Sequence, residues 1–206
     1  MPPRDRTKRR VVPKQQRAQV SADAILGAAE QLLHEVGFAR TTTNRIAARA
    51  GVNVALVYRY FAGKEAIVAA LIERFTQATR DSFEAALSAH AHAPLPELIR
   101  ALLHALVSTP ESPDLHRALF EQIDIAKRRE LVRSQTAAMT QAASVLLTQR
   151  SSELHALRDP AATFFVLEHA IFAATHAASF YRPGDLSRER VLDALTDMVC
   201  RTLLSA

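Results

Sequence analysis

The side chains whose chemistry stands out in this sequence of 206 residues are gathered between Thr42 and Lys64. Hydroxyl, phenol and cationic groups recur there, and all of these donate hydrogen bonds to phosphate oxygens. Contacts of this kind position a protein on a nucleic-acid backbone without reading its sequence. The predicted phosphate-contacting residues are Thr42, Thr43, Arg45, Tyr58, Tyr60 and Lys64. The alternative for each tyrosine is a half-buried ring that closes a small domain.

Catalytic chemistry has no comparable pattern in this sequence. It contains no Gly-rich phosphate loop, HExxH, GxSxG or CxxC motif. His90 and His92 are two residues apart beside prolines, so both rings cannot share one helical face. We therefore expect no enzymatic activity, no metal site and no cofactor.

The charge is divided unevenly along the chain. Residues 1–64 hold 12 Lys/Arg against 4 Asp/Glu, whereas residues 65–206 hold 14 against 17. A basic segment on a mildly acidic remainder indicates that one end meets a polyanion. Nucleic acid is the leading candidate, and an anionic membrane surface is the second.

Composition favours an all-α protein, because only 5 glycines and 6% aromatic residues accompany long Ala/Leu/Arg/Glu-rich stretches. A single cysteine, Cys200, cannot form an intramolecular disulfide, which suits a reducing compartment. We find no signal peptide and no apolar run near the ~20 residues of a membrane span. These features predict a cytoplasmic protein with no membrane partner.

Helical periodicity in the first third predicts a small domain over residues 21–66 behind a disordered basic arm, residues 1–20. That arm is either a solvated tail or a DNA-tracking arm. Ser21 is the predicted N-cap of a first helix that ends at Gly37. Its apolar stripe is Ile25, Ala28, Ala29, Leu32, Leu33 and Val36.

A helix-turn-helix is predicted next. Threonines 41–43 offer caps for a short helix over residues 44–50, which Gly51 interrupts. Asn53 then caps a second short helix over residues 54–61. Val57 and Phe61 are four residues apart and should pack against the first helix. The exposed, DNA-facing surface is predicted to comprise Asn53, Val54, Ala55, Leu56, Tyr58, Arg59 and Tyr60, with Lys64 at its end.

The string TTNRIAARAGVNVALVYRYFAGK, which starts at Thr42, resembles the signature of the TetR family. The resemblance consists of a Thr-rich cap, an Ile-Ala pair, an Ala-Gly-Val turn, a Tyr-x-x-Phe element and a Lys-Glu pair. The matching residues are Thr42, Thr43, Ile46, Ala47, Ala50, Gly51, Val52, Tyr58, Phe61, Lys64 and Glu65. In that family, the positions matching Thr42, Thr43, Tyr58 and Lys64 commonly contact phosphates. Residues 54–56 lack the family's usual Ser/Thr or Lys, and their apolar groups suit thymine methyls.

The remaining sequence predicts a second domain over residues 67–206, bringing the total to about nine helices. Further helices are expected over residues 64–89, from Leu98 to near Pro110, and over 114–124, 129–154, 161–181 and from Ser187. The helix over 161–181 is apolar on nearly every side. It should therefore meet either a second copy of the chain or only its own core.

The resemblance further implies an apolar effector pocket between residues 94 and 160 and a dimer built from the last two helices. Aromatic and polar residues in otherwise aliphatic helices are the candidate ligand contacts, although ordinary packing is the alternative for each. They are His104, Phe120, Ile123, Met139, Phe165, Phe172 and His176.

These features predict a homodimeric transcriptional repressor that binds a palindromic operator and is released by a small apolar or amphipathic effector. The alternative is a basic-tailed helical module that binds a membrane surface or another protein.

Overall fold

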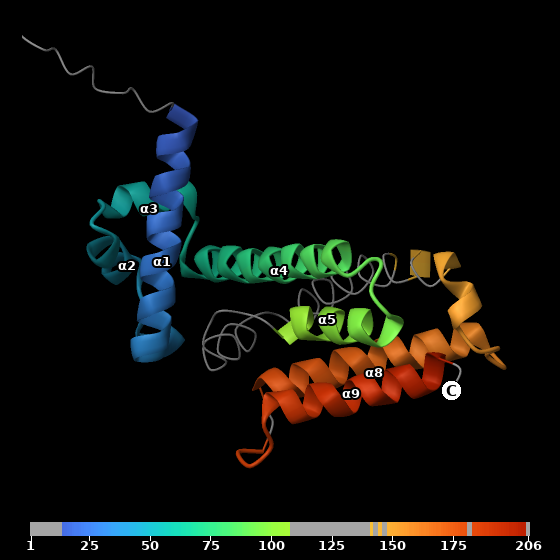
Figure 1. Cartoon of the computed structure of the whole chain (residues 1–206). Coiled ribbons are helices and arrows are strands. Elements are labelled where there is room, and N and C mark those ends of the chain that lie inside the picture. Colours follow the sequence, from blue (N-terminus) through green and yellow to red (C-terminus); the bar gives the residue numbers. More distant parts are fainter. Residues whose placement is uncertain (1–13, 108–140, 142–143, 146–147, 181–182, 205–206) are drawn as a thin grey trace, which may run out of the picture. The chain divides into compact units, whose positions relative to one another are not determined.

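The computed structural model describes residues 14–107, 141, 144–145, 148–180 and 183–204. These residues form seven α-helices and one short 3-10 helix (Figure 1). Within these ranges there is no strand, only an isolated antiparallel bridge between Leu154 and Leu204. The all-α prediction is therefore confirmed, and seven helices have both ends in the described part of the chain, where about nine were expected for the whole chain. The helix expected over 114–124, and most of the one over 129–154, lie outside the described residues.

The chain divides into two compact units, Met1–Leu71 and Ile72–Ala206. The first contains α1 (Lys14–Arg40), α2 (Thr43–Ala50) and α3 (Val54–Tyr60). The second contains α5 (Leu95–Val107), the 3-10 helix η1 (Ser151–Glu153), α8 (Pro160–Phe180) and α9 (Arg188–Leu203). Helix α4 (Lys64–Ala89) begins in the first unit and continues into the second.

Helix α1 begins earlier than the sequence predicted. It begins at Lys14, so Ser21 lies inside the helix rather than capping it, and residues 14–20 are helical rather than disordered. Residues 15–19 read Gln-Gln-Arg-Ala-Gln, which contains no helix breaker, so the helix extends back to just after Pro13. The interruption expected at Gly37 is present, with φ +73° and ψ 171°.

The core of the first unit comes from all of its helices. Ile25 and Leu32 of α1, Ile46 of α2, Val57 of α3 and Ile67 of α4 are each at most 2% exposed. Of the predicted stripe on α1, Val36 alone is half-buried and the others are buried. The stripe therefore faces α2 and α3, with which α1 is in contact.

Helix α5 begins at Leu95, three residues before the predicted start near Leu98. Pro96 therefore lies in the first turn, where its missing N–H leaves no hydrogen bond unmade. Leu95 and Leu98 pack in one cluster with Phe83 of α4.

In the second unit, α8 and α9 lie side by side next to α5 (Figure 1). A shared apolar cluster holds the three helices together. Its buried members are Leu103 and Val107 of α5, Leu167 of α8, and Leu192, Leu195, Val199 and Leu203 of α9. The predicted N-cap Ser187 of α9 is confirmed, because its side chain accepts a hydrogen bond from the backbone N–H of Arg190.

The expectation that no segment is long and apolar enough to span a membrane does not hold for helix α8. Its segment Pro160–Ser179, 20 residues with mean hydropathy 1.2, is long and apolar enough to cross a membrane by length and composition alone. The individual apolar runs are short, because Glu168, His169 and His176 interrupt them. Only 17% of that segment is buried within this chain. Core helices of soluble proteins pass the same test, so the finding is weak evidence for a membrane span.

Candidate nucleic-acid interface

Helix α2 is delimited by the two caps that its sequence favours. Thr42 has extended backbone, and its Oγ1 accepts a hydrogen bond from the Arg45 N–H at 3.3 Å. At the other end, Gly51 adopts the left-handed conformation with φ +66°, and its N–H bonds back to the helix. Because glycine carries no Cβ, it adopts this conformation with little strain. The chain can therefore leave α2 in a tight turn.

The turn leads directly into α3. The Val52 N–H donates to the Ala47 carbonyl at 3.0 Å, and the Asn53 side chain then accepts from the Ala55 N–H at 2.8 Å. Asn53 is thus the N-cap that the sequence predicted. The helix ends at Tyr60, and Phe61 serves as its C-cap. Two short helices joined by this capped turn form a helix-turn-helix.

Helix α3 buries one side and exposes the other. Val57 is fully buried, as the sequence predicted, and Phe61 is half-buried. Ala55 and Arg59 are exposed, and Tyr58 has 55% of its surface exposed. Half-buried residues flank them, namely Val54, Leu56 and Tyr60. The first turn of α3 is therefore not packed into the interior, and its side chains can reach an external partner.

Two of the predicted phosphate contacts lie together. Thr43 Oγ1 of α2 and Tyr58 Oη of α3 are 3.1 Å apart, within hydrogen-bonding distance. Residues fifteen positions apart thereby bring two hydroxyl groups to one place on the surface. Each hydroxyl can both donate and accept, so the pair can add a third oxygen atom as a partner.

The two cationic residues among the predicted phosphate contacts, Arg45 and Lys64, bind backbone carbonyls. Arg45 Nη1 donates to the Arg40 carbonyl at 2.7 Å. Lys64 Nζ donates to the Phe38 carbonyl at 3.0 Å and lies 3.8 Å from the centre of the Phe38 ring. Both groups therefore have partners at the C-terminal end of α1.

Arg49 of α2 forms an ion pair with Glu35 of α1. Its Nη1 and Nη2 atoms donate to the two carboxylate oxygens at 2.8 and 2.7 Å. The hydrogen bond from Arg49 holds the pKa of Glu35 below its ordinary value of 4.5. This exposed pair links α2 to α1 and was missed from the sequence, because the residues are fourteen positions apart.

The structure describes four of the seven candidate ligand residues of the second unit, namely His104, Phe165, Phe172 and His176. Phe120, Ile123 and Met139 lie outside the described residues. Phe165 is 62% exposed and Phe172 is 37% exposed, each beside a histidine one turn later, His169 and His176 respectively. Both phenylalanine rings are thus at least partly open to solvent.

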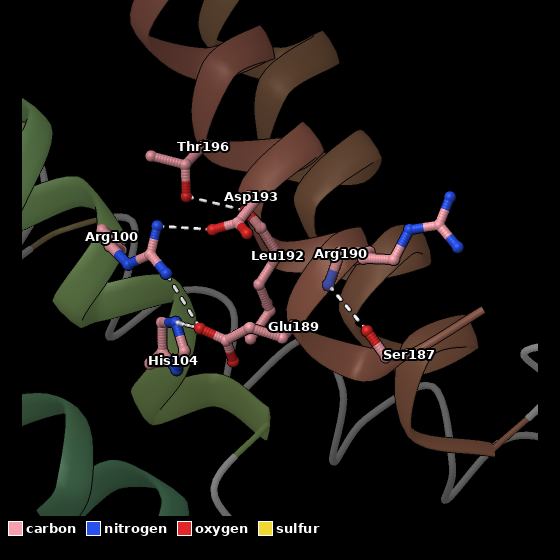
Figure 2. Close-up of polar contacts among 8 residues, drawn as sticks. All are labelled: Arg100, His104, Ser187, Glu189, Arg190, Leu192, Asp193 and Thr196. Atoms are coloured by element: carbon pink, nitrogen blue, oxygen red, sulfur yellow. Dashed lines mark hydrogen bonds and ion pairs between the residues drawn. The ribbon is translucent and has the colours of Figure 1, made fainter.

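His104 belongs to a polar cluster that the sequence analysis missed (Figure 2). Arg100 and His104 of α5 face Glu189 and Asp193 of α9. Arg100 Nη2 lies 2.8 Å from Glu189, His104 Nε2 lies 3.4 Å from the same carboxylate oxygen, and Arg100 also pairs with Asp193. The spacing of four residues on each helix was the available signal, because it places both members on one face.

No group of three or more His, Cys, Asp or Glu side chains could hold a metal ion in the part of the chain that the structure describes. Cys200 is half-buried. Burial, followed by the nearby Asp197 carboxylate, raises the pKa of its thiol. A raised pKa keeps the thiol protonated at neutral pH and so weakly nucleophilic.

The capped helix-turn-helix and the separate helical unit define a DNA-binding transcription regulator. Family models agree over most of the chain: residues 25–71 match "Bacterial regulatory proteins, tetR family", and residues 94–203 match "Tetracyclin repressor-like, C-terminal domain". The chain belongs to the TetR family of transcriptional regulators. The resemblance seen in the sequence is thereby confirmed.

Solved structures with this fold come from several bacteria. A TetR-family regulator from Mesorhizobium loti MAFF303099 is 20% identical, with TM-score 0.70 over 92% of this chain and 99% of that one. SmeT, the repressor of the Stenotrophomonas maltophilia multidrug efflux pump SmeDEF, is 24% identical, with TM-score 0.68 over 91% and 92%. A Saccharomonospora viridis regulator in complex with choline is 18% identical, with TM-score 0.70 over 91% and 100%. No curated protein sequence matches the chain.

Proposed function

We propose that this protein is a homodimeric cytoplasmic repressor that binds a palindromic DNA operator and is released by a small molecule bound in its second unit. The observation that carries the proposal is the partly exposed start of α3, where Asn53 and Ala55 are exposed, together with the Thr43–Tyr58 hydroxyl pair. A recognition helix must present its N-terminal residues to base edges while neighbouring groups bind phosphates. SmeT, which has this fold, is a repressor, and this supports repression rather than activation.

The types of the residues indicate which of them contact bases and which contact phosphates. Val54, Ala55 and Leu56 present apolar groups, which contact thymine methyls rather than hydrogen-bonding to guanine. The remaining predicted contacts, apart from Lys64, bind phosphates or fix the start of α3. They are Thr42, Thr43, Arg45, Asn53, Tyr58, Arg59 and Tyr60.

A second copy of the chain is the proposed partner for the outer face of α8. Phe165 and Val166 are each 62% exposed there, and Met198 of α9 is 41% exposed. Large apolar side chains grouped on adjacent helices are typical of a protein interface. Two copies also suit DNA, because a twofold pair of recognition helices reads two half-sites at once.

Dimerisation can be tested by sedimentation of the full chain. Val166→Asp on α8 should shift the protein towards monomer, because a charge would be buried at the interface. Val145→Asp is the matched control, since Val145 is also exposed, at 48%. Equal behaviour of the two variants would contradict the proposed interface.

Release by an effector is proposed from the chemistry of the second unit. The Saccharomonospora viridis regulator, which shares the fold, was solved with choline. Of the predicted contacts, His104 and His176 are half-buried and so suit the edge of a ligand site. A ligand releases DNA only if it prefers the arrangement that cannot bind the operator.

Fluorescence anisotropy with random-sequence duplex DNA tests the proposed function against the membrane alternative. We expect binding that weakens steeply with salt, because phosphate contacts release counterions. Vesicles of anionic phospholipid should not bind the protein at the same ionic strength. Binding to those vesicles but not to duplex DNA would reject the proposed function.

A further inference from the structure

The C-terminal end of α1 is an acceptor site for side chains from two other helices. Beyond the break at Gly37, the Phe38 carbonyl accepts from Lys64 of α4 and the Arg40 carbonyl accepts from Arg45 of α2. The Thr41 hydroxyl donates to the Gly37 carbonyl at 2.9 Å. These bonds satisfy carbonyls that have no partner within the helix.

Lys64 and its ammonium group lie at different helices. Lys64 is the first residue of α4, where the helix dipole disfavours a positive charge. Its ammonium group instead binds the Phe38 carbonyl, which lies just beyond the non-helical Gly37 near the end of α1. The contact thus turns the charge away from the N-terminal end of α4 and onto another helix.

The Phe38 ring adds a second restraint on the same group. Lys64 Nζ lies 3.8 Å from the ring centre, well within the range of a cation–π contact. The Lys64 side chain is half-buried, and so is Phe38. A lysine held by a carbonyl and a ring has lost much of the freedom that a flexible phosphate contact would retain.

We propose that Lys64 is a positioning residue, which ties the start of α4 to the end of α1 and thereby holds the helix-turn-helix in its DNA-binding geometry. This inference rests on the proposed function, and it replaces the phosphate contact that the sequence predicted for Lys64. Phe38 is the partner through which the residue acts. The tie lies wholly within the first unit, so it operates in each copy of the chain.

The test compares Lys64→Met with Arg59→Met in the full chain. Both variants remove one positive charge, but Arg59 is exposed on α3. For Lys64→Met we expect about five-fold weaker binding to random duplex DNA with an unchanged salt slope. Its thermal midpoint should fall by about 2–4 °C. For Arg59→Met we expect the slope of log K against log salt to fall by about 0.9, with the midpoint unchanged.

Phe38→Leu provides a second route to the same result, because it removes the ring and keeps the charge. It should weaken DNA binding without changing the salt slope, and its effect should not add to that of Lys64→Met. Lys64→Arg should restore binding, since arginine also stacks on rings and binds carbonyls.

A salt slope reduced by about 0.9 in Lys64→Met would overturn the proposal, because one phosphate contact would then have been lost. Additive effects of Phe38→Leu and Lys64→Met would also overturn it. If the unmodified chain fails to bind duplex DNA, the proposed function fails instead. The thermal midpoints of the two variants would still report whether the tie exists.

Discussion

Thr43 Oγ1 and Tyr58 Oη lie 3.1 Å apart, joining the first residue of α2 to the exposed face of α3. Neither helix alone could provide both hydroxyl groups, so the pair depends on the packing between the two helices. We expect it to bind one phosphate group of the duplex.

Tyr58→Phe should weaken duplex binding about five-fold, which corresponds to the loss of roughly 1 kcal/mol of hydrogen bonding. Thr43→Val should have a similar effect, and the double variant should lose less than the sum because the two groups act together. Anisotropy titrations at one salt concentration measure all three. Fully additive losses would show that the hydroxyls contact separate phosphates.

Two valines on α3 separate folding from recognition. Val57 is fully buried and Val54 is half-buried, although they are three residues apart on one helix. Val57→Ala should lower the free energy of unfolding by about 1.5–3 kcal/mol, because it removes buried methyl groups. Val54→Ala should cost under about 1 kcal/mol and instead alter the preferred DNA sequence. Chemical denaturation measures the free energy of unfolding of both variants. Equal decreases in Val57→Ala and Val54→Ala would contradict these roles of the two valines.

Two glycines of the first unit should respond to alanine in opposite directions. Gly51 has φ +66°, so Gly51→Ala should destabilise the protein by about 1–2 kcal/mol. Gly27 lies within α1, and a Cβ added there would meet no atom within 4 Å. Gly27→Ala should therefore stabilise the protein by about 0.5–1 kcal/mol. Thermal unfolding distinguishes the two, and a stabilising Gly51→Ala would refute the left-handed cap.

The Glu35–Arg49 ion pair makes a pH-dependent contribution to stability. Because the folded pKa of Glu35 is below its ordinary value of 4.5, the contribution is present above 4.5 and is lost as the pH falls through the folded pKa. Both side chains are exposed, so the effect should be small. The thermal midpoint of Glu35→Gln should lie slightly below that of the unmodified chain at pH 7, and the difference should shrink as the pH falls below 4.5. Arg49→Met should behave likewise, and a difference that grows towards pH 3 would exclude the ion pair as its cause.

Local patterns accounted for most of the first unit. The caps at Thr42 and Asn53 and the turn at Gly51 were predictable, because each depends on residues within a few positions. The cap at Ser187 in the second unit was predictable for the same reason. The start of α1 was not, since a polar segment without a breaker can be either coil or helix. The sequence predicted a domain boundary between residues 66 and 67, whereas the two compact units divide after Leu71. Both positions lie inside α4, and a continuous helix carries no sequence signal for a domain boundary.

Contacts between distant residues could not be predicted in this way. The Lys64–Phe38 contact spans 26 positions, and Arg100 pairs with α9 across 89 and 93 positions. No periodicity links such residues, because the packing of whole helices brings them together. The sequence therefore indicated which side chains could bind phosphate, but not which of them the fold already engages.

We propose that α3 enters the major groove of DNA and that two copies of the chain present their α3 helices together. Selection of bound duplexes from a random library by the unmodified protein tests it most directly. We predict an enriched inverted repeat whose half-site centres are one helical turn, about 34–36 Å, or a multiple of it apart. A bound pool that stays random, or one enriched in a single site without twofold symmetry, would contradict the claim.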